Sequence, residues 1–246
     1  MAGCGSTRQS RKARAVTTPG LAQAARAIWD RTLDAAFPAR CVGCGEEGPP
    51  LCATCAPALD ARLDLAAGVP IGLPGEIPEP LLQVEWCAAF RGVVRDALHG
   101  IKYGGETRLA EPLGSAIARR WARVGVGAEV VVHVPVHADR ARDRGYDQAD
   151  LIARVAARTL GLPHIGALVR ERATIAQFDL DRADRAANVV DAFVIRDPRM
   201  APHVTGRWIL LIDDVMTTGA TLAACGAALE AAGAIAVSTI TVARER

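Results

Sequence analysis

The pattern of apolar and polar residues predicts an alternation of strands and helices from about residue 84 to the C-terminal end. Short apolar runs predict strands near 84–90, 129–135, 166–170, 190–195, 207–212 and 235–242. Longer stretches with apolar residues at helical spacing, or opened and closed by glycine, predict helices at 92–100, 106–123, 146–160 and 220–232. This alternation is typical of an α/β fold with a mostly parallel sheet and helices on both faces.

The first third of the chain has a different pattern. Residues 21–36 carry apolar side chains at helical spacing and predict a helix, which Pro38 ends. A stretch rich in proline and glycine follows at 66–80 and is typical of a linker. We therefore expect four parts, which are a disordered basic tail (1–20), a helix with a cysteine-rich segment (21–65), a linker (66–82) and the sheet domain (83–246).

Composition limits the classes of function. Half of the 246 residues are hydrophobic but only 4% are aromatic, so the core must consist mainly of small aliphatic side chains. The 29 basic and 27 acidic residues nearly balance, which gives no general signal for nucleic acid or a membrane surface. No apolar run approaches the roughly 18–20 residues that span a bilayer, and the N-terminus lacks the apolar stretch of a secretory signal. We expect a cytoplasmic protein without membrane insertion.

Four of the seven cysteines form two pairs, and the odd total argues against a secreted disulfide scaffold. Seven residues separate Cys41-x2-Cys44 from Cys52-x2-Cys55. Two such pairs can place four thiolates around one tetrahedral ion at about 2.3 Å, which leaves no open position and indicates a structural site. Zn²⁺ is the expected ion, with iron as the alternative. The other three cysteines are expected to pack as small apolar residues: Cys4, Cys87 and Cys225.

The stretch "ILLIDDVMTTGATL" at 209–222 places two acids where an apolar strand is expected to end. Ligands of parallel sheets bind beyond the carboxyl ends of the strands, and the N-terminus of the next helix attracts phosphate. Gly219 would allow close backbone approach, and hydroxyls would add donors from Thr217, Thr218 and Thr221. Ionised carboxylates of Asp213 and Asp214 can accept both hydroxyls of a ribose diol. The pattern thus suits a ribose 5-phosphate, and the alternative is that the acids only cap a helix.

The same stretch resembles the phosphoribosyl pyrophosphate (PRPP) loop of type I phosphoribosyltransferases. The resemblance implies that Asp213 and Asp214 hold the ribose diol. It also implies that the following turn binds the 5-phosphate, through Met216, Thr217, Thr218, Gly219, Ala220 and Thr221.

Three further stretches resemble the ComF family of competence-associated, phosphoribosyltransferase-like proteins. They are "FRGVVRDALHGIKYGGETRLAEPLG" (90–114), "VPVHADRARDRGYDQADLIA" (134–153) and "LVRERATIAQFDLDRADRAANVVDAF" (168–193). The four-cysteine segment ahead of the sheet domain resembles the family as well. The chain departs from the family pattern at His133, where a proline is usual, and at Asp147, where an asparagine is usual.

This resemblance implies further site residues. The backbone of Pro135 and Val136 would approach the pyrophosphate, and Lys102 would reach inward from "GIKYGG". Arg144 follows the same turn, and its guanidinium suits phosphate oxygens. The polar stretch 170–188, rich in arginine, would form a mobile lid over the site. An ordinary surface charge is the alternative for Lys102 and Arg144, and a surface loop without a role is the alternative for 170–188.

The expected function is Mg²⁺-assisted transfer of the phosphoribosyl group of PRPP, with Asp213, Asp214, Lys102 and Arg144 in the catalytic centre. No residue pattern identifies the acceptor. The ComF resemblance implies a role in competence and DNA uptake. The alternative is a non-catalytic accessory protein that binds PRPP or single-stranded DNA, with DNA-uptake proteins as further partners.

Overall fold

The computed structural model describes residues 40–68, 77–170 and 192–245. The predicted basic tail, the helix at 21–36 and nearly all of the predicted lid lie outside these residues. Residues 69–76 of the predicted linker also lie outside them, so the expected division into four parts stays a prediction.

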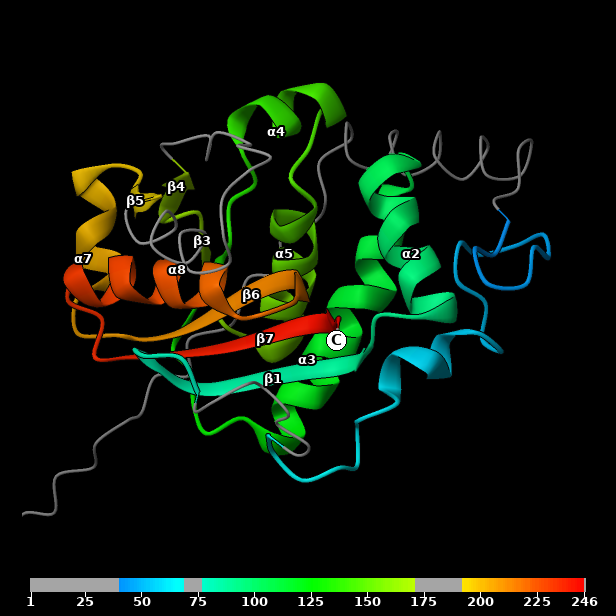
Figure 1. Cartoon of the computed structure of the whole chain (residues 1–246), viewed down its shortest axis with the longest axis horizontal. Coiled ribbons are helices and arrows are strands. Elements are labelled where there is room, and N and C mark those ends of the chain that lie inside the picture. The colour runs from blue at the N-terminus through cyan, green and yellow to red at the C-terminus, as the bar shows by residue number, and fades with distance from the viewer. Residues whose placement is uncertain (1–39, 69–76, 171–191, 246) are drawn as a thin grey trace, which may run out of the picture. The chain divides into compact units, whose positions relative to one another are not determined.

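The centre of the protein is a five-stranded parallel sheet with the strand order β1-β7-β6-β2-β3 (Figure 1). Four strands correspond to predicted ones, and the short edge strand β3 was not predicted. Their bounds are β1 (Leu81–Ala89), β2 (Val130–His133), β3 (His164–Ile165), β6 (Trp208–Met216) and β7 (Ala236–Arg244). The predicted fold class, a mostly parallel sheet with helices on both faces, is confirmed.

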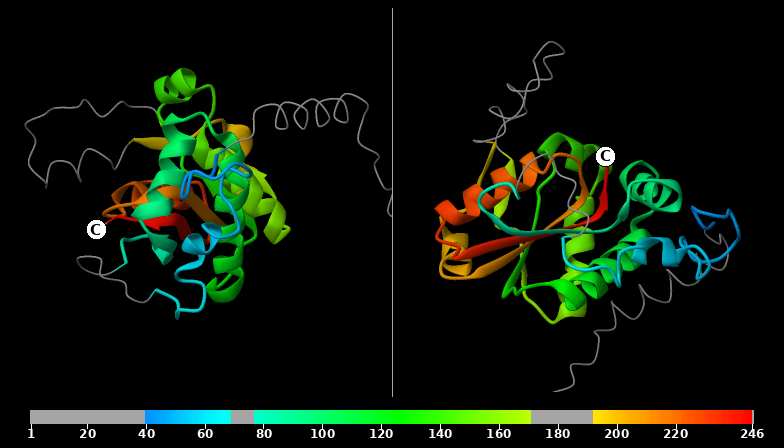
Figure 2. Two further views of the ribbon diagram at one scale, coloured as in Figure 1. Left: turned by 90° about the vertical axis from the view of Figure 1, so that its right-hand side faces the viewer. Right: turned by 60° about the horizontal axis from the view of Figure 1, so that its bottom comes forward.

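Helices cover both faces of the sheet, as Figure 2 shows. On β6, Leu210 and Ile212 belong to the core shared with α2 (Gly92–Tyr103), α3 (Ala110–Val124) and α5 (Gln148–Leu160). Ile209 and Leu211 belong to the opposite core, shared with α8 (Ala220–Ala231) and α7 (Ala201–Val204). All four side chains are fully buried, which explains why this strand is apolar at successive positions.

Two predicted strands lie outside the main sheet. Residues 168–170 form β4 (Leu168–Arg170) and residues 193–195 form β5 (Phe193–Ile195), and the two strands pair with each other antiparallel. Leu168 and Phe193 are buried in the core on the α8 side of the sheet. A short apolar run shows that a strand is buried but not which partner it pairs with, so the expected place of these strands in the parallel alternation was wrong.

A short helix follows β2, in a segment for which the sequence predicted no helix. This helix is α4 (Ala138–Arg144), and the His137 side chain caps it by accepting from the Asp139 N–H at 3.3 Å. Gly145 ends it in the left-handed region, at φ 77°. Arg140, Arg142 and Arg144 are therefore helical residues. The remaining short helices are η1 (Ala56–Asp60), η2 (Thr107–Leu109) and η3 (Pro198–Met200).

The cysteine-rich segment packs directly on the helices of the sheet domain. Cys41, Leu51 and Leu59 are buried in the same core as residues of α2 and α3. A buried ion pair strengthens this junction, because Arg120 Nη2 of α3 lies 2.9 Å from Glu85 Oε2 of β1. The same guanidinium donates to the carbonyls of Arg62 and Leu65 at 2.6 Å each, so one side chain joins three parts of the chain. None of the described helices has the length and apolar character needed to cross a membrane.

Candidate functional site

The two acids predicted to follow a strand lie within it. Strand β6 continues through Asp213 and Asp214 to Met216, four residues beyond the predicted end. Thr217 and Thr218 are exposed, and Gly219 turns the chain into α8 at φ 85°. The strand, the turn and the helix N-terminus thus follow each other as the sequence predicted.

Asp214 is the centre of a polar network on the α2 and α5 side of the sheet. Its side chain is almost fully buried, at 5% exposed. Lys102 Nζ, in the last turn of α2, lies 2.9 Å from Asp214 Oδ1. Gln148 at the start of α5 donates from Nε2 to Asp214 Oδ2 at 2.8 Å. Arg144 Nη1 in turn donates to Gln148 Oε1 at 2.8 Å, which connects the second predicted cation to the same network.

Asp213 has a different environment, because successive side chains of a strand point to opposite faces. It is half-buried, and its Oδ1 accepts from the Asp214 N–H at 2.8 Å. Burial, followed by the nearby charge of Asp214, raises the pKa of Asp213 well above its ordinary value. The Asp214 carboxylate is therefore neutralised by Lys102, whereas ionisation of Asp213 costs free energy because its charge is partly removed from water.

Lys102 and Arg144 line a hollow of about 580 Å³ together with Arg140. The Tyr146 hydroxyl donates to the Ile101 carbonyl at 2.5 Å, which attaches the start of α5 to α2. The Arg144 guanidinium lies 5.1 Å from the ring centroid of Tyr103. One acid, Asp143, also lines the hollow, so its cations outnumber its acids and form a candidate binding surface for an anion.

Pro135 and Val136, predicted to present backbone donors to pyrophosphate, line a different cavity, of about 570 Å³. Pro135 has no N–H, and the Val136 N–H already donates to Asp147 Oδ2 at 3.0 Å. The second oxygen of Asp147 caps α5 by accepting from Ala149 N–H at 2.9 Å. The acid that replaces the family's asparagine thus holds the turn and the helix start together. Among the described peptide bonds only Glu79–Pro80 is cis, so the bond before Pro135 is trans.

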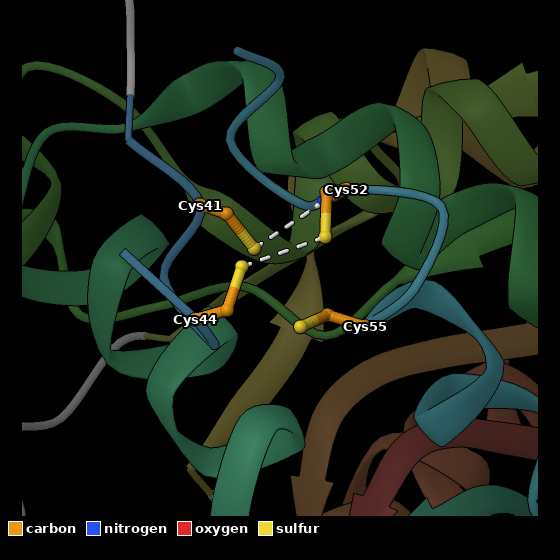
Figure 3. A group of neighbouring side chains, drawn as sticks. All are labelled: Cys41, Cys44, Cys52 and Cys55. Atoms are coloured by element: carbon orange, nitrogen blue, oxygen red, sulfur yellow. Dashed lines mark hydrogen bonds between the residues drawn. The ribbon is translucent and has the colours of Figure 1, made fainter. Parts of the chain in front are cut away.

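The four predicted metal ligands converge, as Figure 3 shows. Their sulfur atoms all lie within 4.8 Å of one another, and Cys44 Sγ lies 3.7 Å from Cys52 Sγ. A tetrahedral ion with bonds of about 2.3 Å separates its sulfurs by about 3.8 Å, so the cluster fits Zn²⁺. The Cys41 carbonyl accepts from the Gly45 N–H, and the Cys52 carbonyl accepts from the Ala56 N–H, so each pair lies in a tight turn.

The thiols of this cluster differ in acidity. Burial opposes ionisation of Cys41, but backbone donors at Cys52, Cys44 and Gly43 outweigh it and lower its pKa to about 6. Burial and the neighbouring thiols raise the pKa of Cys55 to about 12. A cation at the centre would remove the repulsion between the thiolates and favour ionisation of all four.

Sequence reasoning did not predict that Gln148 bonds to Asp214. The two residues are 66 positions apart, so no spacing in the sequence indicates that they are partners. Gln148 lies in the stretch 134–153 that carries the family resemblance, but no contact was assigned to it. The predicted site residues fall into two groups. Lys102 contacts Asp214 directly and Arg144 is connected to it through Gln148, whereas Pro135 and Val136 line the other cavity.

Several known proteins are similar to this chain in sequence. The chain is 28% identical to the DNA utilization protein YhgH of Salmonella typhi over 188 residues, which are 70% of this chain and 81% of that protein. It is 29% identical to the YhgH protein of Escherichia coli K12, over 69% of this chain and 75% of the relative. Competence protein F of Haemophilus influenzae is 36% identical over 96 residues, or 38% of this chain and 41% of that protein.

These relatives support a ComF-family protein. The resemblance drawn from the sequence is thereby confirmed. Among solved structures, this chain matches a glutamine PRPP amidotransferase from B. subtilis, complexed with ADP and GMP. The identity is 22% and the TM-score 0.37, over 54% of this chain and 26% of that one. No protein-family model matches the chain.

Proposed function

We propose that the protein binds PRPP and transfers its phosphoribosyl group to an acceptor. One observation carries the proposal, which is the order of chemical groups along the site. The threonine turn at the start of α8 follows the two acids of β6 along the chain, and Lys102, which lines the hollow with Arg140 and Arg144, contacts Asp214 on the other side of these acids. PRPP has three parts that these groups could bind: the 5-phosphate would bind at the turn, the ribose diol at the acids, and the pyrophosphate at the hollow.

The two acids take different parts in this proposal. Asp213 is the more exposed carboxylate, so it is the better acceptor for a ribose hydroxyl. Both oxygens of Asp214 already have partners, in Lys102 and Gln148. Each carboxylate oxygen has two lone pairs, so Asp214 can accept one further hydroxyl without breaking these contacts.

Bond cleavage would place negative charge on the departing pyrophosphate and positive charge on the ribose. Lys102, Arg140 and Arg144 would stabilise the first, and the acids would stabilise the second. Mg²⁺ carried by PRPP would neutralise part of the pyrophosphate charge. Because Lys102 contacts Asp214, the two sets of charges are held next to each other before the substrate arrives.

Isothermal titration with the two halves of PRPP tests the assignment. We expect Asp213→Asn to weaken ribose 5-phosphate binding and leave pyrophosphate binding nearly unchanged. Arg140→Ala should have the opposite selectivity, because Arg140 lines only the basic hollow. Asp96→Asn is the matched control, since Asp96 is a partly exposed acid of α2 that pairs with Arg95. Equal heats for ribose 5-phosphate from the wild-type and Asp213→Asn proteins would contradict the proposal.

Turnover needs a separate measurement. We expect pyrophosphate release from PRPP and Mg²⁺ in the presence of a suitable acceptor, and loss of this release in Asp213→Asn. A protein that binds PRPP but releases no pyrophosphate with any nucleobase or amine acceptor would favour the non-catalytic alternative, in which PRPP is only sensed.

The names of the relatives support a cellular role in the use or uptake of DNA. We propose that the reaction, or PRPP binding, serves this process. Deletion of the gene should lower transformation with linear DNA, and the Asp213→Asn gene should fail to restore it. A filter-binding assay with single-stranded DNA separates direct DNA contact from an indirect role, because phosphate contacts make affinity fall with salt. Full complementation by Asp213→Asn would separate the DNA role from the PRPP site.

A further inference from the structure

Three side chains that the proposed function does not use come together beside the end of β2. His133 is the last residue of β2, and His164 begins the neighbouring strand β3. His164 pairs with Val131, and residues 131 and 133 point to the same face, so the two rings lie side by side. Asp150 reaches them from the first turn of α5.

The ligand atoms form a compact triangle. His133 Nδ1 lies 3.1 Å from His164 Nε2 and 3.5 Å from Asp150 Oδ1. His164 Nε2 lies 3.6 Å from the same carboxylate oxygen. A tetrahedral ion with bonds of about 2.0–2.1 Å separates its ligand atoms by about 3.3–3.4 Å. One small cation above this triangle would therefore reach all three atoms at bonding distance.

We propose that His133, Asp150 and His164 form a second metal site, separate from the four cysteines, for a divalent first-row transition metal such as Zn²⁺. Two histidines and one carboxylate are a common donor set for such ions, and they leave coordination positions for water or a ligand. The cysteine cluster, by contrast, supplies four sulfurs and is closed.

The surroundings of the triangle resemble those of a built metal site. The second oxygen of Asp150 accepts from Arg154 Nε at 2.7 Å, which fixes the carboxylate and aims its other oxygen at the rings. His133 is 4% exposed, so its ring is shielded from bulk water.

A cavity beside the two histidines and Asp150 indicates which ligand would occupy the open coordination position of the metal ion. His133 and Asp150 both line the cavity of about 570 Å³ that also contains Pro135 and Val136. Its lining has three arginines (Arg154, Arg170 and Arg196) against two aspartates (Asp147 and Asp150), so its formal charge is positive and favours an anion. We infer that the remaining position takes water or an oxygen of a phosphate-like anion.

Metal content of the folded chain tests this site. The wild-type protein and its variants are loaded with Zn²⁺, desalted, and analysed by plasma mass spectrometry. We expect His164→Gln to hold about one equivalent less than the wild type, because a glutamine keeps polarity but is a poor zinc ligand. His203→Gln is the matched control, since His203 is an exposed histidine of α7, and it should lose none.

Equal zinc content in the wild-type and His164→Gln proteins would overturn the proposal and leave a hydrogen-bonded histidine pair. Because the comparison uses a difference of one equivalent, it does not depend on whether the cysteine cluster is loaded. Should His164→Gln fail to fold, histidine side-chain ¹⁵N spectra of the wild type give the answer. Zn²⁺ should then shift the ring nitrogens of His133 and His164 but not those of His203, and unshifted signals would overturn the site.

Discussion

The cysteine cluster and the Asp214 network are both polar centres on the α2 side of the sheet, but they are assembled in opposite ways. The four cysteines lie within residues 41–55, and short turns bring their sulfurs together. The Asp214 network joins Lys102, Gln148 and Arg144, which belong to three different helices. The first centre is local in sequence, and the second exists only when the sheet and its helices are packed.

This difference determines how each centre is stabilised. The thiols of the cluster repel one another when ionised, so the cluster depends on a cation from outside the chain. Asp214 has its cation inside the protein, because Lys102 pairs with it and Gln148 satisfies its second oxygen. Loss of the ion should therefore affect the first centre, and loss of one side chain the second.

The largest effect is expected from Cys44→Ser, which removes a ligand from the cluster. Structural zinc sites in small domains contribute about 10–16 kcal/mol of binding free energy, and much of it depends on the complete set of four ligands. We expect about one metal equivalent to be lost and the amides of 41–56 to exchange faster, as measured by mass spectrometry and hydrogen exchange. Cys225 is a buried cysteine outside the cluster, so the Cys225→Ala protein should keep the metal content of the wild type. Unchanged metal content in Cys44→Ser would show that the cluster is not a metal site.

Asp214→Asn should have the next largest effect, because it leaves the Lys102 ammonium without its counter-charge. The Lys102 side chain is only 17% exposed, so we expect a loss of about 3 kcal/mol in the free energy of unfolding, measured with urea. Adding Lys102→Met should recover part of this loss, since the unpaired charge is then removed. If the double variant were no more stable than Asp214→Asn, the ion pair would not be the source of the effect.

Gly43→Ala tests how closely the cysteine cluster is packed. An added Cβ would lie 2.8 Å from Cys55 Sγ and 3.0 Å from Val93 Cγ2, so at least one of them must move. We expect a loss of about 1–3 kcal/mol in unfolding free energy and weaker zinc binding in a chelator competition. Ala53→Ser, at an exposed position of the same segment, should change neither quantity. Wild-type zinc affinity in Gly43→Ala would mean that the cluster adapts without cost.

The smallest effect is expected from Asp213→Asn, and its sign should differ from that of Asp214→Asn. The pKa of Asp213 is raised in the folded protein, so its ionisation favours the unfolded chain. The stability that the protonated group contributes is complete below its ordinary value of 3.8 and is lost as the pH rises through the folded value. Asp213→Asn should therefore gain stability relative to wild type as the pH rises. A constant difference across a series of urea titrations from acidic to neutral pH would contradict this.

Much of the fold and part of the site could be predicted from the sequence. The apolar run of β6, the turn at 217–219 and the start of α8 follow from hydrophobic pattern and turn residues that are adjacent in the chain. The cysteine cluster was predictable for the same reason, since its spacing alone limits how far apart the sulfurs can lie. The antiparallel pairing of β4 with β5 was not, because apolar character does not specify a strand's neighbour.

The sequence by itself determined the main strands and helices of the sheet domain, and it determined that two acids and four cysteines stand at places where chemistry is possible. Tertiary structure alone decided that Asp214 is buried against Lys102 and Gln148 while Asp213 on the other face stays half-buried. It also decided that His133, Asp150 and His164 meet. The physical reason is that local structure depends on neighbours along the chain, whereas charge pairing and ligand geometry depend on distances that exist only after the helices pack onto the sheet.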